Sequence, residues 1–235
     1  MSTKRAELKT KLKTITMDYD LRVFFRDFLD EFVAEDDTLT NPVSTTTITV
    51  DTLVAGDITL SDTSWDDLRF PVSAIKLQGT GSEPDIENTY GTYLFDDGTP
   101  ETVFIMAQMP HAWKEGTNVF PHTHWYKTTS ATGDVCWQLD YIISKKGAQF
   151  SDTFTTITGV TPAIGDNDTV RTHALTPIGS SGIDMTGCGL SDHIIMKLTR
   201  KADATIDTYG ADAGLLEFDI HYEIDSFGSD SEFTQ

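Results

Sequence analysis

The segment FDIHYEID, residues 218–225, alternates apolar and polar side chains over its whole length. Successive side chains of a β-strand point to opposite faces of a sheet, so this pattern predicts a strand with one buried face and one face toward solvent. All apolar residues of this segment are aromatic or β-branched, and both types favour strands. This stretch therefore indicates a two-layered β protein rather than a helical one.

Working outward from this strand, the same kind of run recurs along most of the chain. Clear runs are predicted at about 44–50, 102–109, 119–127, 134–144, 169–176 and 193–200. Gly- and Asp-containing breaks, such as Asp97-Gly98 and Ser181-Gly182, separate several of them. No helix-length crossover lies between the runs, so we expect an antiparallel β-sandwich, with a jelly roll as the favoured topology.

The N-terminal part of the sequence shows a helical pattern instead of the strand pattern. Residues 17–33 place an apolar stripe at helical spacing, which predicts an amphipathic helix. Its phenylalanines would either pack against the protein's own β domain or form a subunit interface. The acidic run 35–37 and the Asn41-Pro42 pair end the helix, so we expect a basic arm and helix over residues 1–41 and a β domain over 42–235.

The composition of the chain excludes some classes of binding partner. The net charge is −20, and a surface of that sign repels the phosphates of nucleic acids and anionic membranes. No apolar run is long enough for a membrane span or a signal peptide, so the sequence predicts a soluble, unexported product. Cys136 and Cys188 match no disulfide framework or zinc motif, and we expect both to be free, buried thiols.

The stretch PHAWKEG at 110–116, followed by PHTHW at 121–125, contains half of the histidines. In a strand over 119–127, His122 and His124 would share one face, as two imidazoles that bind one metal ion must. A third ligand would come from a neighbouring strand or from the same pair repeated about a threefold axis. The candidates are His111, His193, His221 and Glu223. Alternatively, the two histidines stack with Trp113 and Trp125 and bind no metal.

The spacing of Gly116, His122 and His124 resembles the first motif of the cupins, a family of metal-binding jelly rolls. The acidic residue of that motif has no counterpart, because residues 127–130 read Lys-Thr-Thr-Ser. The second cupin motif has no good counterpart either. Since phosphate loops, nucleophile elbows and His-Glu-x-x-His motifs are also missing from the sequence, we expect that the protein is not an enzyme and needs no cofactor, apart from a metal ion at the His-x-His pair.

Four segments resemble, in order, a set of tailed-bacteriophage virion proteins. They are WDDLRFP at 65–71, MPHAWKEG at 109–116, PHTHW at 121–125 and the WQLDY strand at 137–141 after Gly133. The similarity covers about residues 60–145. It implies a β-rich structural component of the virion, assembled in the host cytoplasm and forming a homotrimer.

The resemblance leaves the position on the particle open. A capsid decoration (cement) protein bound to the major capsid protein is favoured, and a head fibre or a tail-associated protein that attaches to a host receptor or glycan is the alternative. A cupin-like metal-binding enzyme is a further alternative. In the glycan case, Trp65, Tyr90, Tyr93 or Trp125 would stack on a sugar ring. In the decoration case, the N-terminal part would bind the particle through Lys9, Lys11, Lys13, Phe24, Phe25, Phe28 and Phe32.

Overall fold

The computed structural model describes residues 64–79, 81–162, 169–229 and 232. The predicted basic arm, the helix at 17–33 and the strand at 44–50 lie outside these residues. So do the predicted particle-binding residues Lys9, Lys11, Lys13, Phe24, Phe25, Phe28 and Phe32. In the described part, no helix is long and apolar enough to cross a membrane.

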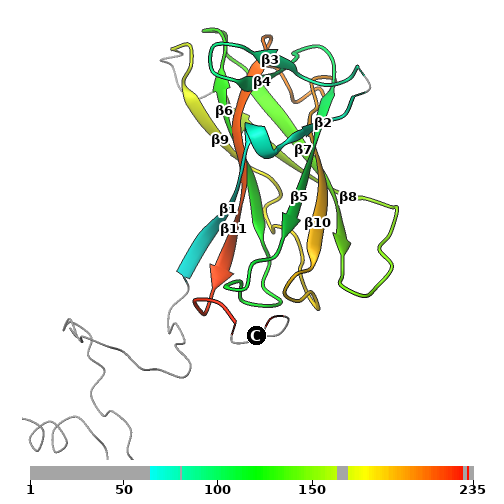
Figure 1. The fold of residues 1–235 in the computed structure, drawn as a ribbon. Coiled ribbons are helices and arrows are strands. Elements are labelled where there is room, and N and C mark those ends of the chain that lie inside the picture. Colours follow the sequence, from blue (N-terminus) through cyan, green and yellow to red (C-terminus); the bar gives the residue numbers. More distant parts are fainter. Residues whose placement is uncertain (1–63, 80, 163–168, 230–231, 233–235) are drawn as a thin grey trace, which may run out of the picture. The chain divides into compact units, whose positions relative to one another are not determined.

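The described residues fold into two antiparallel sheets, as the alternating sequence pattern predicts (Figure 1). The only helical element among them is a 3-10 turn, Val72–Ala74. The strands are β1 (Ser64–Pro71), β2 (Lys76–Leu77), β3 (Asp85–Glu87), β4 (Thr92–Phe95), β5 (Glu101–Gln108), β6 (Phe120–Lys127), β7 (Asp134–Ser144), β8 (Thr155–Pro162), β9 (His173–Pro177), β10 (His193–Arg200) and β11 (Ala213–Ile224).

The first sheet has the order β3-β4-β11-β6-β9, and β1 also pairs with β11. The second sheet has the order β2-β5-β10-β7-β8. Strands far apart in the sequence are therefore neighbours: β1 and β4 pair with β11, β5 with β10 and β6 with β9, whereas β7 pairs with the next strand of the chain, β8. Because these pairs are divided between two sheets, the chain passes repeatedly from one sheet to the other. The predicted β-sandwich is therefore confirmed.

The core lies between the two sheets and is built from the inward side of each strand. Trp125 and Phe218 from the first sheet, and Trp137 and Leu198 from the second, are fully buried in it. Because such side chains interdigitate with few voids, their burial supplies most of the stabilisation of the sandwich. Cys136 and Cys188 are free and buried, as expected.

The strand predicted from FDIHYEID is longer than the alternation suggests. β11 begins at Ala213, and its register with β6 shifts between Leu215 and Glu217. A bulge of this kind inserts one extra residue, so the inward-outward alternation restarts at Glu217. β4 pairs with β11 before the bulge and β1 pairs with it from Glu217 onward.

Some boundaries differ from the sequence prediction. The run predicted at 169–176 forms a strand only from His173 to Pro177, because residues 169–172 make turn hydrogen bonds. The strands β1, β2, β3, β4 and β8 were not among the predicted runs; β1 and β8 carry many polar side chains, so their alternation is weak in the sequence. Gly133 precedes β7 with a φ of 138°, and a Cβ there would lie 2.4 Å from the carbonyl oxygen of Thr208. Only glycine fits this turn.

Candidate functional site

The candidate site lies on the outer face of the first sheet. In β6, Thr123 and Trp125 point into the core, so the alternation of the strand directs His122 and His124 to the opposite face. The sequence prediction that the two imidazoles share a face is thus confirmed. Trp113 and Trp125, with which the histidines would alternatively stack, are both fully buried in the core.

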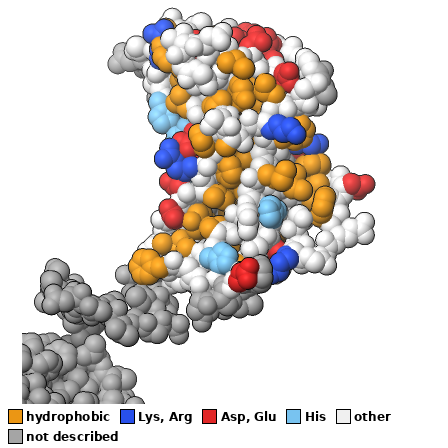
Figure 2. Space-filling view, viewed as in Figure 1, with side chains coloured by type: hydrophobic (Ala, Val, Ile, Leu, Met, Phe, Trp, Pro, Cys, Tyr) orange, Lys and Arg blue, Asp and Glu red, His pale blue; other side chains and the backbone are white. Residues whose placement is uncertain are grey.

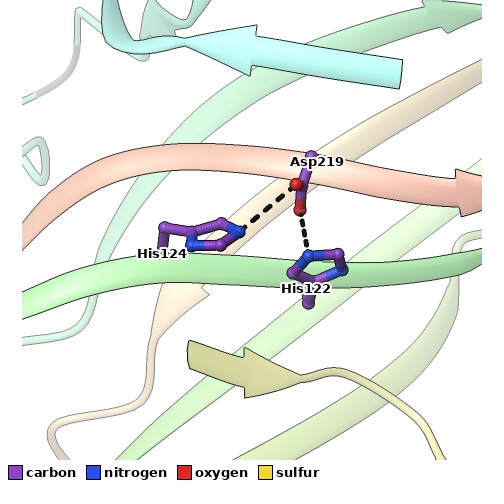
Figure 3. A group of neighbouring side chains, drawn as sticks. All are labelled: His122, His124 and Asp219. Atoms are coloured by element: carbon purple, nitrogen blue, oxygen red, sulfur yellow. Dashed lines mark hydrogen bonds and ion pairs between the residues drawn. The ribbon is translucent and has the colours of Figure 1, made fainter. Parts of the chain in front are cut away.

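Asp219 of β11 lies between the two imidazoles. It is the direct neighbour of His122 across the β6–β11 pair. The Nε2 atom of His122 is 2.6 Å from Asp219 Oδ1, and the Nε2 atom of His124 is 3.3 Å from Asp219 Oδ2. Figure 3 shows both rings directed at the same carboxylate. The two carboxylate oxygens are thus divided between the two histidines.

This carboxylate is buried. The side chains of His122 and Asp219 are each 5% exposed, and that of His124 is 22% exposed, so solvent reaches the cluster from the His124 side. Asp219 Oδ1 lies 2.6 Å from His122 Nε2 but accepts no hydrogen bond from any described residue. A buried carboxylate oxygen without a hydrogen bond is costly unless a cation compensates it.

Two further histidines extend the cluster on either side. His221, the outward residue after Asp219 on β11, packs its ring 4.1 Å from that of His122 and has its Nε2 atom 2.8 Å from Asp67 Oδ1. On the other side, His124 Nδ1 is 2.7 Å from His173 Nε2. Burial, and then the neighbouring charge of His124, lower the pKa of His173, which favours its neutral form.

Charged pairs border the histidines along β1 and β11. Arg69 binds Glu217 with two hydrogen bonds of 2.7 and 2.6 Å, and these bonds raise the pKa of the guanidinium. Lys114 Nζ is 3.1 Å from Glu223 Oε2. In Figure 2, histidine, basic and acidic side chains gather along the flank over β1 and β11. The outer face of this sheet is therefore polar and charged.

None of the third ligands proposed from the sequence joins His122 and His124 as closely as Asp219 does. His111 contacts Ser229, His193 lies on β10 of the other sheet beside the Ser191 carbonyl, and Glu223 pairs with Lys114. His221 contacts His122 but is held by Asp67. The groups whose ligand atoms lie within 4.8 Å of one another here are His122–His124–Asp219 and Asp67–Asp219–His221.

Sequence reasoning did not identify Asp219, Asp67 or His173 as site residues. The alternation in FDIHYEID already places Asp219 on the solvent side of its strand together with His221. The alternation does not show which residues lie opposite Asp219, because the register between β11 and β6 joins residues almost a hundred positions apart. A rule that combined outward acidic residues with outward histidines would have selected Asp219 among several candidates.

The aromatic residues considered for sugar stacking differ in how far their side chains are exposed. Trp65 and Tyr90 are 49% and 53% exposed, whereas Trp125 is fully buried. Trp125 cannot stack on a sugar ring, and that interpretation was wrong because its position on β6 points inward. Tyr93 is partly buried against the core and donates a hydrogen bond to the Ile75 carbonyl.

The chain matches no protein-family model and no curated protein. Among solved structures, it is similar to the carbohydrate-binding module CBM28, which is specific for non-crystalline cellulose. The TM-score is 0.31 and the sequence identity is 6%, over 66% of this chain and 89% of the module.

Proposed function

We propose that this chain is a structural protein of a tailed-bacteriophage particle, a homotrimeric capsid decoration protein that binds the particle through its N-terminal part. The proposal starts from the four segments that resemble phage virion proteins. The observation that carries it is the position of these segments. Polar side chains from three of them, Asp67 and Arg69, Lys114, and His122 and His124, contribute to one continuous face of the first sheet.

This clustering matters because core packing does not explain it. The polar residues of the three segments point outward and contact residues of β11, while Trp113 and Trp125 of the same segments and Trp137 of the fourth segment belong to the core. The outward set supports a surface that the protein uses.

The strand pairing supports a jelly roll, the topology that we favour for this sandwich. The first strands of the domain, β1 and β4, pair with the last, β11. The pairs β5–β10, β6–β9 and β7–β8 nest inside this outer pair. Jelly rolls occur in viral capsid proteins and in lectins, so the topology is compatible with both decoration and attachment. It does not by itself separate the two functions.

An exposed apolar patch on the second sheet supports self-association. Met106 of β5 is 66% exposed, and its register neighbour Ile195 of β10 is partly exposed, whereas Ile142 of β7, beyond Ile195, is buried at 7%. Phe104 is partly buried on the same side of β5. Methionine and aromatic residues are enriched in protein interfaces, and contiguous apolar patches mark interaction sites.

The deciding experiment measures co-sedimentation of the purified chain with empty phage capsids and, separately, with purified tails. We expect the full chain to bind capsids. A variant with Phe24, Phe25, Phe28 and Phe32 replaced by serine should lose this binding, because these side chains are the proposed anchors. The control replaces Phe227, which is 77% exposed on the β domain, by serine and should bind normally.

If neither capsids nor tails retain the full chain, the virion proposal is wrong. Binding to tails alone would move the protein to the attachment role, which the exposed Trp65 and Tyr90 also favour. Retention of the four-serine variant on capsids would show that the anchor lies elsewhere in the chain.

A further inference from the structure

We propose that His122, His124 and Asp219 bind one divalent transition-metal ion on the outer face of the first sheet, with Zn²⁺ as a fitting ion. The inference is independent of the proposed particle function. It rests on the donor set, on the distances between the donor atoms and on the unsatisfied oxygen of Asp219.

The donor set suits this class of metal. Imidazole nitrogens bind zinc, copper, iron and nickel, and a carboxylate oxygen completes the two-histidine, one-carboxylate set found in several zinc and iron sites. Three protein ligands leave a further coordination position for water or an outside group. Here the more exposed His124 marks the side on which that position would open.

One ligand atom from each of the three residues lies within 4.8 Å of the other two, so a shared ion requires only a small adjustment. With metal–ligand distances of about 2.0–2.2 Å, two donors of a tetrahedral site lie roughly 3.3 Å apart. His124 Nε2 and Asp219 Oδ2 are already 3.3 Å apart. His122 Nε2 and Asp219 Oδ1 are closer, at 2.6 Å, so His122 would withdraw by several tenths of an ångström when the ion enters.

Asp219 gives the second, independent observation. Its Oδ1 atom is buried and accepts no hydrogen bond from the described residues, although an imidazole nitrogen lies beside it. Arg69 is the register neighbour of Asp219 on β1, but its guanidinium is bound by both oxygens of Glu217. A metal ion between the imidazoles and the carboxylate would place a positive charge beside this oxygen.

His173 supports the same assignment from outside the donor set. Histidines that bind metals usually form a hydrogen bond through their other ring nitrogen, which fixes the tautomer. When His124 Nδ1 donates its proton to His173 Nε2, 2.7 Å away, His124 Nε2 presents a lone pair toward Asp219. That arrangement is repulsive without a cation and favourable with one.

The test uses the full chain, stripped with a chelator, dialysed and titrated with Zn²⁺ by calorimetry. Co²⁺ serves as a spectroscopic probe of the ligand geometry. We expect about one ion per chain, and an increase in the unfolding midpoint with Zn²⁺ concentration because the ion binds the folded state. His124→Gln and Asp219→Asn should abolish this binding. His173→Gln should weaken it by about 10–100-fold, as outer partners of metal sites do.

His193→Gln is the matched control, because His193 lies on the other sheet with its ring beside the Ser191 carbonyl. It should bind Zn²⁺ like the unmodified chain. Circular dichroism of each metal-free variant checks the fold, and the part-exposed His124→Gln is the variant least expected to disturb it. The proposal is overturned if the stripped chain binds less than about half an ion, or if His193→Gln lowers binding as much as His124→Gln.

Discussion

Glu101 is a half-buried carboxyl group at the start of β5, among other acidic side chains. Its Oε2 atom accepts a hydrogen bond of 2.7 Å from the backbone N–H of Asp96. Burial, together with the negative charges of Asp96, Asp85 and Asp212, raises the pKa of Glu101 from 4.5 to about 7, and the hydrogen bond from Asp96 offsets part of this. The fold therefore favours the neutral form of this side chain.

This pKa predicts how stability changes with pH. Between about pH 4.5 and 7 the folded chain holds a proton on Glu101 that the unfolded chain has released. The unfolded state then binds fewer protons, so the free energy of unfolding falls as pH rises through this window. Glu101→Gln should be more stable than the unmodified chain at pH 8 and nearly equal to it at pH 5.

Urea unfolding at the two pH values measures this difference. The glutamine keeps an oxygen acceptor for the N–H of Asp96, so the substitution removes the charge and preserves this hydrogen bond. Asp152→Asn, an exposed carboxylate on the loop between β7 and β8, is the control and should show no such difference between the two pH values. Equal stability of Glu101→Gln and the unmodified chain at pH 8 would contradict the assignment.

At the scale of elements, Arg200 fastens the end of β10 to the loop that leads into β11. Its side chain is fully buried, and its guanidinium donates hydrogen bonds to both oxygens of Asp207 and to the carbonyls of Phe95, Tyr209 and Ala211. Phe95 belongs to the first sheet and Arg200 to the second. A single side chain thus connects the two sheets and the loop after β10.

Removing this guanidinium should be strongly destabilising. Arg200→Met leaves Asp207 as a buried carboxylate without its cation, at a cost of about 3–5 kcal/mol in the free energy of unfolding. The neighbouring Lys201→Met is the control. Lys201 pairs with Asp203 at the surface, and the loss of that pair should cost less than about 1 kcal/mol. Urea unfolding curves of the two variants test the contrast, and similar losses for both would refute it.

Some local features of the turns and strands can be predicted from the sequence, and others cannot. The turn at Asp97-Gly98 forms as predicted, because Asp96 Oδ1 accepts hydrogen bonds from the N–H groups of Gly98 and Thr99. Gly214 of β11 has no sequence signal of its own. The ring of Tyr126 lies across it, and a Cβ there would be 2.1 Å from that ring, so the glycine makes room for a cross-strand neighbour.

At the scale of the whole molecule, the patch around Met106 predicts how the chain assembles. Met106→Lys introduces a charge into the exposed apolar patch and should convert the expected trimer into monomers, because a buried unpaired charge opposes association. The fold should be unaffected, since the side chain is 66% exposed. Sedimentation velocity measures the outcome. Ile206→Lys, on the β10–β11 loop and 50% exposed, is the control and should remain trimeric.

A monomeric unmodified chain, or a trimeric Met106→Lys variant, would show that this patch is not the subunit interface. The first result would also remove the threefold repeat of the His pair considered from the sequence. The metal site proposed here would stand, since its three ligands come from a single chain.

The sequence alone determined the class of fold and part of the site. The alternation of FDIHYEID and of the runs at 102–109, 119–127, 134–144 and 193–200 is a local property of each strand, and it was sufficient to predict a two-sheet sandwich. The same alternation placed His122 and His124 on one face, because residues two positions apart in a strand always share a face.

Only the tertiary structure decided which side chains these histidines meet. Asp219 lies beside His122, and Asp67 beside His221, because of the register of β11 with β6 and with β1. Register is set by the burial of whole strands against the common core, and a shift of one residue would turn every outward side chain inward. It therefore depends on the complete set of strands at once, which no single segment of this sequence encodes.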